Sequence, residues 1–596
     1  MRRLVAALAA VVALGAAPAG AGGAPPRDAA AVRARRTTVW QRAHARLAKA
    51  FPAGAHSDAA ELLNDWAELT DAGDLDGDGK NELVDVRTRL EYDDTLGFRE
   101  TVRLEAFRGS DGKALWNRAL PAAAIVFPIF TTVGVDGKRG VVVVSYEIVE
   151  DGTDNAGGGY GAVTVASFDG AGTPLWVREL GGSYGYAPLT YAAGATDVEA
   201  EIDAVAGGGK DLLLRTVLFT DAGSPADRRT TAQQFSILDG ATGVVRPVGQ
   251  PTQTEFAGSV LAAGDLDGDQ LDDIVTEVGS GGSVGLVALS STVAGKELWR
   301  LAQFATTDAE TYLVRLPDVT GDGRADVGAE TLVFGGGIIV IGPGRKPSGP
   351  TQPSSTMTLI DGARGTVAWA KKGSRLMVLG NADRKAGAEV AIGTGVYGSG
   401  KAGFTVAAYT ATGRRLWSVT RTVKGVDDVD SSGFGEIGDV GTDGVADIGF
   451  GIVAGAGKRV RRDEGTIDGR TGRVTKDPRP GMYITRAALD GRGNDAYERV
   501  ASRGLFTLHT WRGDQPVRLW SVTVRASGLV SRSTPTSVDG DKCGDVVFTI
   551  SDAGFRSIVY SGSTGRPLWQ LDRSGNAAGT VGAPSIVSHR TYRRGC

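Results

Sequence analysis

The stretch Asp74-Leu-Asp-Gly-Asp-Gly-Lys-Asn-Glu82, which runs directly into a short apolar segment, decides the fold because it recurs along the chain. Copies at 265–273 and 318–326 also place oxygen-bearing side chains at positions one, three, five and nine, again before an apolar segment. Ca²⁺ takes about six to eight oxygen ligands, and alternate side chains of a tight turn can converge on one point. We therefore interpret the chain as a repeat protein that binds calcium.

Weaker copies of this acidic loop fill the intervals between the complete ones. The copy at 439–447 lacks a side-chain ligand at position three, and the copy at 537–545 has Ser537 in place of the first acid. Copies at 203–211, 381–389 and 490–498 keep the first and ninth positions, and a poor match lies near 133–140. The pattern recurs roughly every 60 residues and gives nine candidate units.

A second motif, a glycine turn that leads into Leu-Trp or a similar pair, alternates with the acidic loops. Its tryptophans are Trp116, Trp176, Trp299, Trp369, Trp417, Trp520 and Trp569. Short β runs bounded by glycine separate the motifs, so each unit has room for four antiparallel strands. Four-stranded sheets repeated radially form a β-propeller. We expect an all-β chain with a single large β-propeller of eight or nine four-stranded blades over 70–572, in which the first and last units could share one blade.

The two ends of the chain carry different signals. Residues 1–21 combine a basic start, a short apolar stretch and a small-residue cleavage site, which is typical of a secretory signal peptide. We expect a linker and a short helical segment over 22–69, and a tail over 573–596 that closes on the last blade. The apolar stretch is too short for a membrane span. The sequence therefore predicts a secreted, extracellular protein with no membrane span, and we expect a monomer.

The cysteine count agrees with export. Cys543 and Cys596 are the only two cysteines. An even pair in an oxidising compartment predicts one disulfide, which would join the tail to the last unit. Two free thiols are the alternative.

Composition narrows the classes of function. The formal net charge of −4 gives no basis for a nucleic-acid partner. Only four histidines are present, which disfavours histidine-based catalysis and a histidine-rich zinc site. We recognise no nucleophile–base pair, and we expect a protein that is not an enzyme.

Two known repeats resemble these motifs. The acidic loop, as in Gly264-Asp-Leu-Asp-Gly-Asp269, resembles the FG-GAP or VCBS repeat of integrin α-subunit propellers and many secreted bacterial proteins. The glycine turn with Leu-Trp resembles the tryptophan-docking repeat of quinoprotein-type propellers. Together the resemblances cover roughly residues 70–572 and imply a propeller fold with calcium loops. They imply no particular activity, because propellers carry unrelated functions.

The resemblance also implies the metal ligands, with the residue at position seven contributing its backbone carbonyl. The complete sets are Asp74, Asp76, Asp78, Lys80 and Glu82; Asp265, Asp267, Asp269, Leu271 and Asp273; and Asp318, Thr320, Asp322, Arg324 and Asp326. Two less complete sets are Asp439, Asp443 and Asp447, and Asp539, Asp541 and Asp545. We expect about three to five structural Ca²⁺ ions. Binding is expected to be weaker in the second set, where Gln270 replaces the usual glycine.

Two alternatives to these calcium loops remain open. An EF-hand also begins with alternating acids, but it needs a glutamate at position twelve, where this chain has Asp85, Thr276 or Ala329. The loops could also be turns without metal, because Asp and Gly are common turn residues. Several ions spread over a repeat favour a structural role over a catalytic one.

We expect a calcium-binding propeller that acts as a non-catalytic binding, adhesion or scaffold module for an extracellular protein or a surface glycan. Gly-rich insertions at 151–160 and 334–353 are candidates for recognition, since loops on a rigid scaffold often carry it. The alternative is a propeller-fold enzyme, either a calcium-dependent polysaccharide lyase or a quinoprotein-type dehydrogenase.

Overall fold

The computed structural model describes most of residues 69–591, with longer gaps at 150–158, 183–194, 220–229, 250–258, 334–353 and 485–495. The described residues form strands and turns without a helix. Several predicted features lie wholly or mostly outside the described residues. These are the signal peptide (1–21), the linker and helical segment (22–69), both Gly-rich insertions, the loops near 133–140 and 490–498, and Cys596.

The chain divides into two compact units, one of residues 1–247, 487–492 and 499–596 and one of residues 248–486 and 493–498. Three sheets of the first unit come from its N-terminal part. They are β1 (Thr70–Gly73), β2 (Glu82–Asp93), β3 (Gly97–Phe107) and β4 (Ala114–Ala119); β5 (Ile125–Thr132), β6 (Arg139–Val149), β7 (Gly159–Asp169) and β8 (Pro174–Gly182); and β9 (Ala195–Ile202), β10 (Asp211–Phe219), β11 (Thr230–Leu238) and β12 (Val245–Gly249).

The second unit contributes four sheets of the same kind. They are β13 (Val260–Gly264), β14 (Asp273–Ser280), β15 (Ser283–Leu289) and β16 (Glu297–Thr306); β17 (Ala309–Leu316), β18 (Asp326–Val333), β19 (Ser354–Asp361) and β20 (Thr366–Lys372); β21 (Arg375–Gly380), β22 (Glu389–Gly398), β23 (Lys401–Tyr409) and β24 (Arg415–Lys424); and β25 (Val429–Gly438), β26 (Asp447–Ala454), β27 (Arg461–Ile467) and β28 (Val474–Lys476).

The C-terminal part forms two five-stranded sheets. One holds β29 (Met482–Ile484), β30 (Ala496–Ser502), β31 (Leu505–Trp511), β32 (Arg518–Arg525) and β38 (Ile586–Thr591), and the other holds β33 (Gly528–Ser533), β34 (Val546–Ser551), β35 (Phe555–Tyr560), β36 (Pro567–Asp572) and β37 (Thr580–Gly582). The fifth strands come from the tail, which pairs with both β36 and β32.

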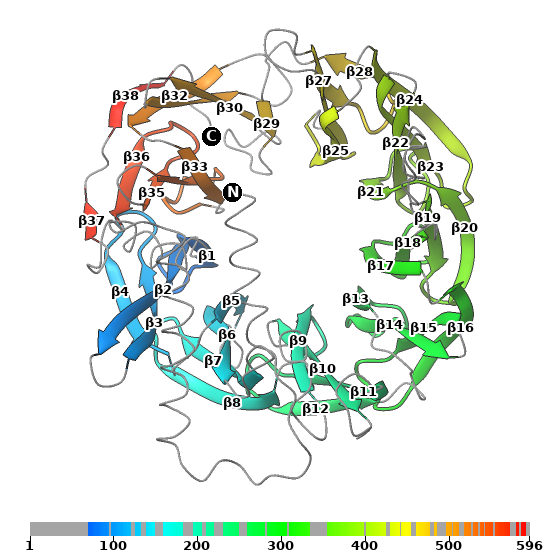
Figure 1. The fold of residues 1–596 in the computed structure, drawn as a ribbon, viewed down its shortest axis with the longest axis horizontal. Coiled ribbons are helices and arrows are strands. Elements are labelled where there is room, and N and C mark those ends of the chain that lie inside the picture. Colours follow the sequence, from blue (N-terminus) through cyan, green and yellow to red (C-terminus); the bar gives the residue numbers. More distant parts are fainter. Residues whose placement is uncertain are drawn as a thin grey trace, which may run out of the picture. The chain divides into compact units, whose positions relative to one another are not determined.

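Within each sheet, strands that follow one another in the chain pair antiparallel, as Figure 1 shows. The described residues thus form nine sheets, which are the blades of a β-propeller. The predicted all-β propeller is confirmed. The first and last units form separate sheets, and the prediction of four strands per blade fails for the last two, because the tail adds one strand to each.

The apolar segment after each acidic loop is the second strand of its sheet. Leu83 and Val84 in β2, and Ile274 and Val275 in β14, are all buried, although neighbouring side chains of a strand point to opposite faces. These strands are covered on both faces, which explains why they read as continuous apolar runs.

Tryptophans on the fourth strands join consecutive sheets inside each unit. In the first unit Nε1 of Trp116 donates to the Gly170 carbonyl oxygen at 2.9 Å, and Nε1 of Trp176 donates to the Gly240 carbonyl oxygen at 3.2 Å. In the second unit Trp299 makes the same bond to Gly362 at 2.6 Å. At these positions the motif predicted to pack between blades therefore also fixes a blade to the next one by a hydrogen bond.

The first and last sheets are joined in the same way. Trp569 on β36 donates to Gly109 in the turn between β3 and β4, at 2.6 Å. Leu69, Leu83 and Phe107 share a buried cluster with residues of the last sheet that include Val538. The N- and C-terminal sheets of the first unit are therefore neighbours.

Candidate metal sites in the acidic loops

Each acidic loop links the first and second strands of a sheet and is folded by its own side chains. In the first loop Asp74 accepts the backbone N–H of Gly77 at 2.7 Å and of Gly79 at 3.0 Å. Both glycines have positive φ, 82° and 83°, which a residue without a Cβ adopts at little cost. In the second loop Gln270 adopts φ 70° at the position of Gly79, so the backbone there carries the strain that the substitution predicted.

The ninth residue of each loop is a buried carboxylate that anchors the loop. Asp273 accepts the backbone N–H of Leu266 at 2.9 Å and that of Ser291, in the hairpin between β15 and β16, at 3.1 Å. Asp545 does the same with Val538 at 2.6 Å and Gly562 at 2.7 Å. In these two loops the ninth acid therefore ties the loop to the glycine-turn hairpin of its own sheet, a role that holds with or without a metal.

Burial also makes these anchoring groups hard to ionise. Burial raises the pKa of Glu82, Asp273 and Asp545 to about 7, although backbone N–H groups lower it. Neighbouring carboxylates of the same loop raise it further, as Asp76 and Asp78 do for Glu82. A bound cation is one means of relieving such an accumulation of negative charge.

Three acidic groups in the described residues bring carboxylate oxygens close enough to share one ion. In each group the ligand atoms lie within 4.8 Å of one another. The groups are Asp74, Asp76 and Asp78; Asp265, Asp267 and Asp269; and Asp539, Asp541 and Asp545. Two were predicted as complete sets, whereas the third was predicted as a less complete one.

Two unsatisfied oxygens fit a cation in these loops. Glu82 is completely buried, and its Oε1 has no hydrogen-bond partner while Oε2 accepts from Leu75 at 2.6 Å. Oδ1 of Asp267 is also buried without a partner. A buried polar atom without a partner is costly, so each is suited to a ligand that accepts its lone pair.

The remaining predicted sets are arranged differently. The Thr320 hydroxyl is directed to Asp326 Oδ1 at 3.3 Å, and the acids of this loop form none of the three groups. Asp443 contacts the Arg470 guanidinium, with Nε at 2.7 Å from Oδ2. Metal binding by the sets around Asp318 and Asp439 remains a prediction, as does the use of the position-seven carbonyls.

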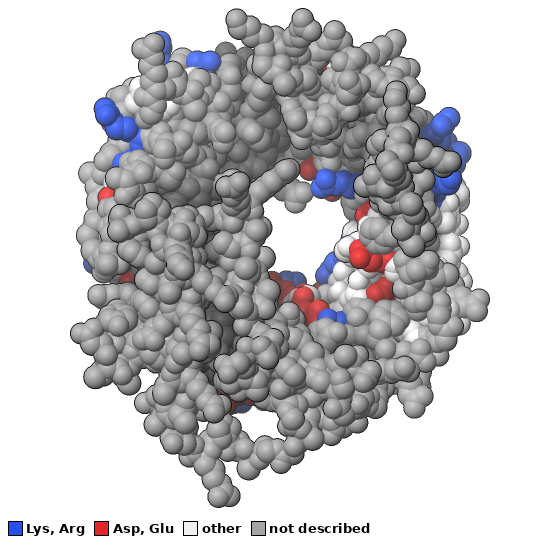
Figure 2. Space-filling view, viewed as in Figure 1, with Lys and Arg blue, Asp and Glu red and all other residues white. Residues whose placement is uncertain are grey.

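The sequence analysis missed a set of basic side chains that face the acidic loops. They come from the hairpin between the third and fourth strands of the same sheet. Lys296 Nζ lies 2.8 Å from Asp267, and Arg108 Nε lies 3.8 Å from Asp76. The signal was present in the turn motif, where a Lys or Arg recurs near the glycine before Leu-Trp. On the face drawn in Figure 2, basic and acidic side chains of described residues likewise lie beside one another.

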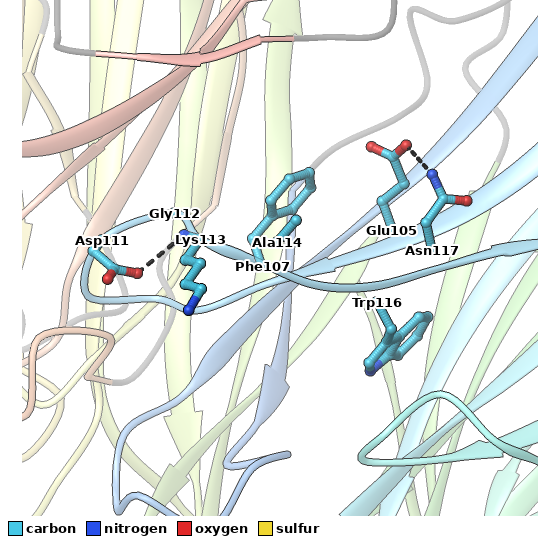
Figure 3. A pocket seen from close by; sticks show the side chains of 8 residues that line it. All are labelled: Glu105, Phe107, Asp111, Gly112, Lys113, Ala114, Trp116 and Asn117. Atoms are coloured by element: carbon cyan, nitrogen blue, oxygen red, sulfur yellow. Dashed lines mark hydrogen bonds between the residues drawn. The ribbon is translucent and has the colours of Figure 1, made fainter.

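A pocket of about 370 Å³ lies at the hairpin between β3 and β4 (Figure 3). Its polar side chains include Glu105, which accepts from Asn117 at 2.6 Å, and Asp111, which accepts the Lys113 backbone N–H at 3.0 Å. The Trp116 indole in its wall is bonded to Gly170. These groups hold the hairpin together and form no nucleophile–base pair. Cys543 is buried, and its predicted disulfide stays a prediction because Cys596 lies outside the described residues.

Comparisons with known proteins assign no family. No family model matches the chain, and no curated protein matches it. Among solved structures, the Bacillus licheniformis rhamnogalacturonan lyase PL11 is 13% identical over 83% of this chain and 90% of its own, with a TM-score of 0.40. The exotype rhamnogalacturonan lyase YesX is 14% identical over 83% and 90%, with a TM-score of 0.39. The β-propeller domain of the Trilobed protease from Pyrococcus furiosus is 8% identical over 67% and 93%, with a TM-score of 0.25.

These similarities are too low to carry an activity over to this chain. Among the described residues, no helix is long and apolar enough to cross a membrane. The structure establishes the arrangement of strands and the acidic groups between them. The chain is a β-propeller protein, and its described residues include three acidic groups, each of which could hold a metal ion.

Proposed function

We propose that this protein is an exported, calcium-stabilised β-propeller that binds an extracellular protein or a surface glycan without catalysing a reaction. The observation that carries the calcium part is the buried Oε1 of Glu82, which has no hydrogen-bond partner and belongs to the same loop as Asp74, Asp76 and Asp78. The candidate ligands are all oxygens, which suit Ca²⁺ better than the nitrogen and sulfur ligands that softer metals prefer.

The bound ion would act on stability. It would neutralise carboxylates that crowd together in a buried loop, and it would bind the folded chain in preference to the unfolded one. An ion present at about 100 times its Kd stabilises the folded state by about 2.7 kcal/mol. Since the loop joins the first two strands of a blade, this stabilisation would act on that blade.

A thermal melt of the mature protein in chelator and across a calcium titration tests this part. Elemental analysis of the same sample gives the ion count, and magnesium serves as the control because it demands a smaller octahedral site. We expect the melting temperature to rise with calcium and much less with magnesium. If the melting temperature did not change and no metal were bound, the loops would be turns that bind no calcium, and this part of the proposal would be wrong.

The binding part of the proposal rests on the scaffold character of the recognised motifs. The acidic loops and the docked tryptophans are occupied in holding the sheets together, and the described residues form no recognisable catalytic group. A screen of extracellular proteins and glycans with the calcium-loaded protein would seek the partner. Conversion of an acidic polysaccharide into unsaturated products, or oxidation of an alcohol with a bound quinone, would favour the enzyme alternatives.

A further inference from the structure

We infer that the calcium requirement of this protein is concentrated where the first and last sheets meet, in the loops 74–82 and 537–545. In the loops 265–273 and 439–447, Lys296 and Arg470 supply the positive charge that the ion supplies at the junction. This inference rests on the proposed calcium binding and specifies which loops need the ion. We call 74–82 and 537–545 the junction loops.

Among the described residues, the first junction loop forms one ion pair. It is the contact of Arg108 with Asp76 at 3.8 Å, and the same guanidinium also contacts Asp111 at 3.4 Å. Glu82 is fully buried and keeps an oxygen without a partner. The loop therefore combines four carboxylates with its own Lys80 and with one basic contact from outside, that of Arg108.

The second junction loop has fewer basic contacts among the described residues, which do not include its own Lys542. No Lys or Arg of the described residues forms an ion pair with Asp539, Asp541 or Asp545. The stem of Lys80 packs over Gly540, where a Cβ would lie 3.0 Å from its Cε, yet its ammonium makes no such pair either. Three carboxylates that share one point repel one another unless a cation or protons neutralise them.

The two junction loops are in direct contact. The backbone N–H of Asn81 donates to the carbonyl oxygen of Ser537 at 3.0 Å. Gly109, which accepts from Trp569, has room for no side chain, because a Cβ there would lie 2.1 Å from the Asn81 carbonyl oxygen and 2.6 Å from Cβ of Val538. Charge repulsion in either loop therefore acts on the contact that joins the N-terminal sheet to the C-terminal one.

In the loops 265–273 and 439–447 a basic side chain already contacts the acids. Lys296 Nζ is 2.8 Å from Asp267, and the Arg324 guanidinium is 3.5 Å from Asp265. Arg470 contacts both the Asp443 carboxylate at 2.7 Å and the Asp443 carbonyl oxygen at 2.8 Å. An incoming cation must displace these groups, so they compete with it.

Calcium titration of the full mature chain by calorimetry, with ions counted by native mass spectrometry, tests the inference. We expect two tight ions in the wild type, and one after either Asp76→Asn or Asp541→Asn. Glu179→Gln, which removes an exposed carboxylate outside every acidic loop, serves as the matched control and should leave two. Circular dichroism in calcium checks that each variant is folded.

A variant that should bind calcium more tightly gives a second test, which does not depend on removing a ligand from a loop. We expect Lys296→Met to tighten calcium binding in its loop by about three- to tenfold, the effect of removing a competing ion pair. Loss of a tight ion in Asp267→Asn but not in Asp541→Asn would overturn the inference, as would unchanged binding in Lys296→Met. If no variant and no wild-type sample binds calcium, the proposed calcium binding itself is wrong.

Discussion

The indole of Trp569 donates its N–H to the carbonyl oxygen of Gly109 across 2.6 Å, although 460 residues separate the two in the chain. Trp116 and Gly170 make the equivalent bond between consecutive sheets. The junction of the first and last sheets therefore follows the same local rule as the consecutive sheets joined by Trp116 and Gly170. It needs no special element, only a tryptophan at the end of the repeat and a glycine turn at its beginning.

The contribution of the indole hydrogen bond to stability can be measured by comparison with Trp369, a tryptophan of the same motif that lacks this bond. Nε1 of Trp369 is buried without a partner, and Ala411 stands at the position of Gly362, the residue whose carbonyl oxygen accepts the bond from Trp299. We expect Trp299→Phe to lower the free energy of unfolding by about 1 kcal/mol more than Trp369→Phe, since only the first loses a hydrogen bond. Denaturant unfolding of both variants measures the difference, and equal costs would mean that the bond adds nothing to packing.

The docking glycines should be intolerant of any side chain. A Cβ on Gly362 would lie 1.9 Å from the Ala325 carbonyl oxygen, whereas a Cβ on Gly323 would meet nothing within 4 Å and only its φ of 86° is unfavourable. We expect Gly323→Ala to cost about 1–2 kcal/mol from backbone strain. Gly362→Ala should cost more, because the hairpin must move away from the Ala325 carbonyl group. The melting temperatures of the two variants decide this, and the reverse order would refute it.

The buried Asp211 should make stability fall as the pH rises. Burial raises its pKa to about 6, against the lowering effect of the Gly240 and Ala204 N–H groups. The folded state then binds more protons than the unfolded state between about pH 4 and pH 6, so the free energy of unfolding decreases across this window. Below it the group contributes no difference, and above it the loss is complete.

Asp211→Asn isolates this contribution from those of the other carboxylates. In chelator, the difference in free energy of unfolding between variant and wild type should shift in favour of the variant from pH 4 to pH 6 and then level off. Denaturant unfolding at intervals of about half a pH unit gives the curve. A difference that does not change with pH would show that Asp211 ionises normally in the folded protein.

The C-terminal tail should stabilise the last two sheets. Its strands β37 and β38 cover the outer edges of β36 and β32. We expect removal of residues 580–596 to lower the melting temperature and to promote association, because it exposes two strand edges. Cys596→Ser is the control for the predicted disulfide alone, and a truncated chain no less stable than this variant would assign the whole effect to the cysteine.

The repeating elements could be predicted from the sequence because each depends on local chemistry. The glycines and acids of 74–82 indicate a tight turn by themselves, and the apolar run from Leu83 indicates a covered strand. The alternation of such loops with Trp116 and its relatives was enough to predict a propeller of four-stranded blades.

The contacts that depend on distant residues could not be predicted in the same way. Nothing near Lys296 in the chain indicates that its ammonium reaches Asp267, because 29 residues separate them. The pairing of β38 with β32 could not be predicted either, because all strands of the last sheet lie between the two in the chain. From the identity of the residues alone, the loop at 537–545 was predicted to be a less complete metal site than the loop at 318–326. In the structure, the acids of 537–545 lie close enough together to share one ion.

The most direct test of the account is the position of bound ions in crystals of the mature protein. Anomalous diffraction from crystals grown with calcium or a lanthanide in its place would locate them. The account predicts one strong peak among Asp74, Asp76 and Asp78 and one among Asp539, Asp541 and Asp545, with weaker density or none beside Lys296 and Arg470. A crystal in which both junction loops lack a peak under saturating ion would contradict it.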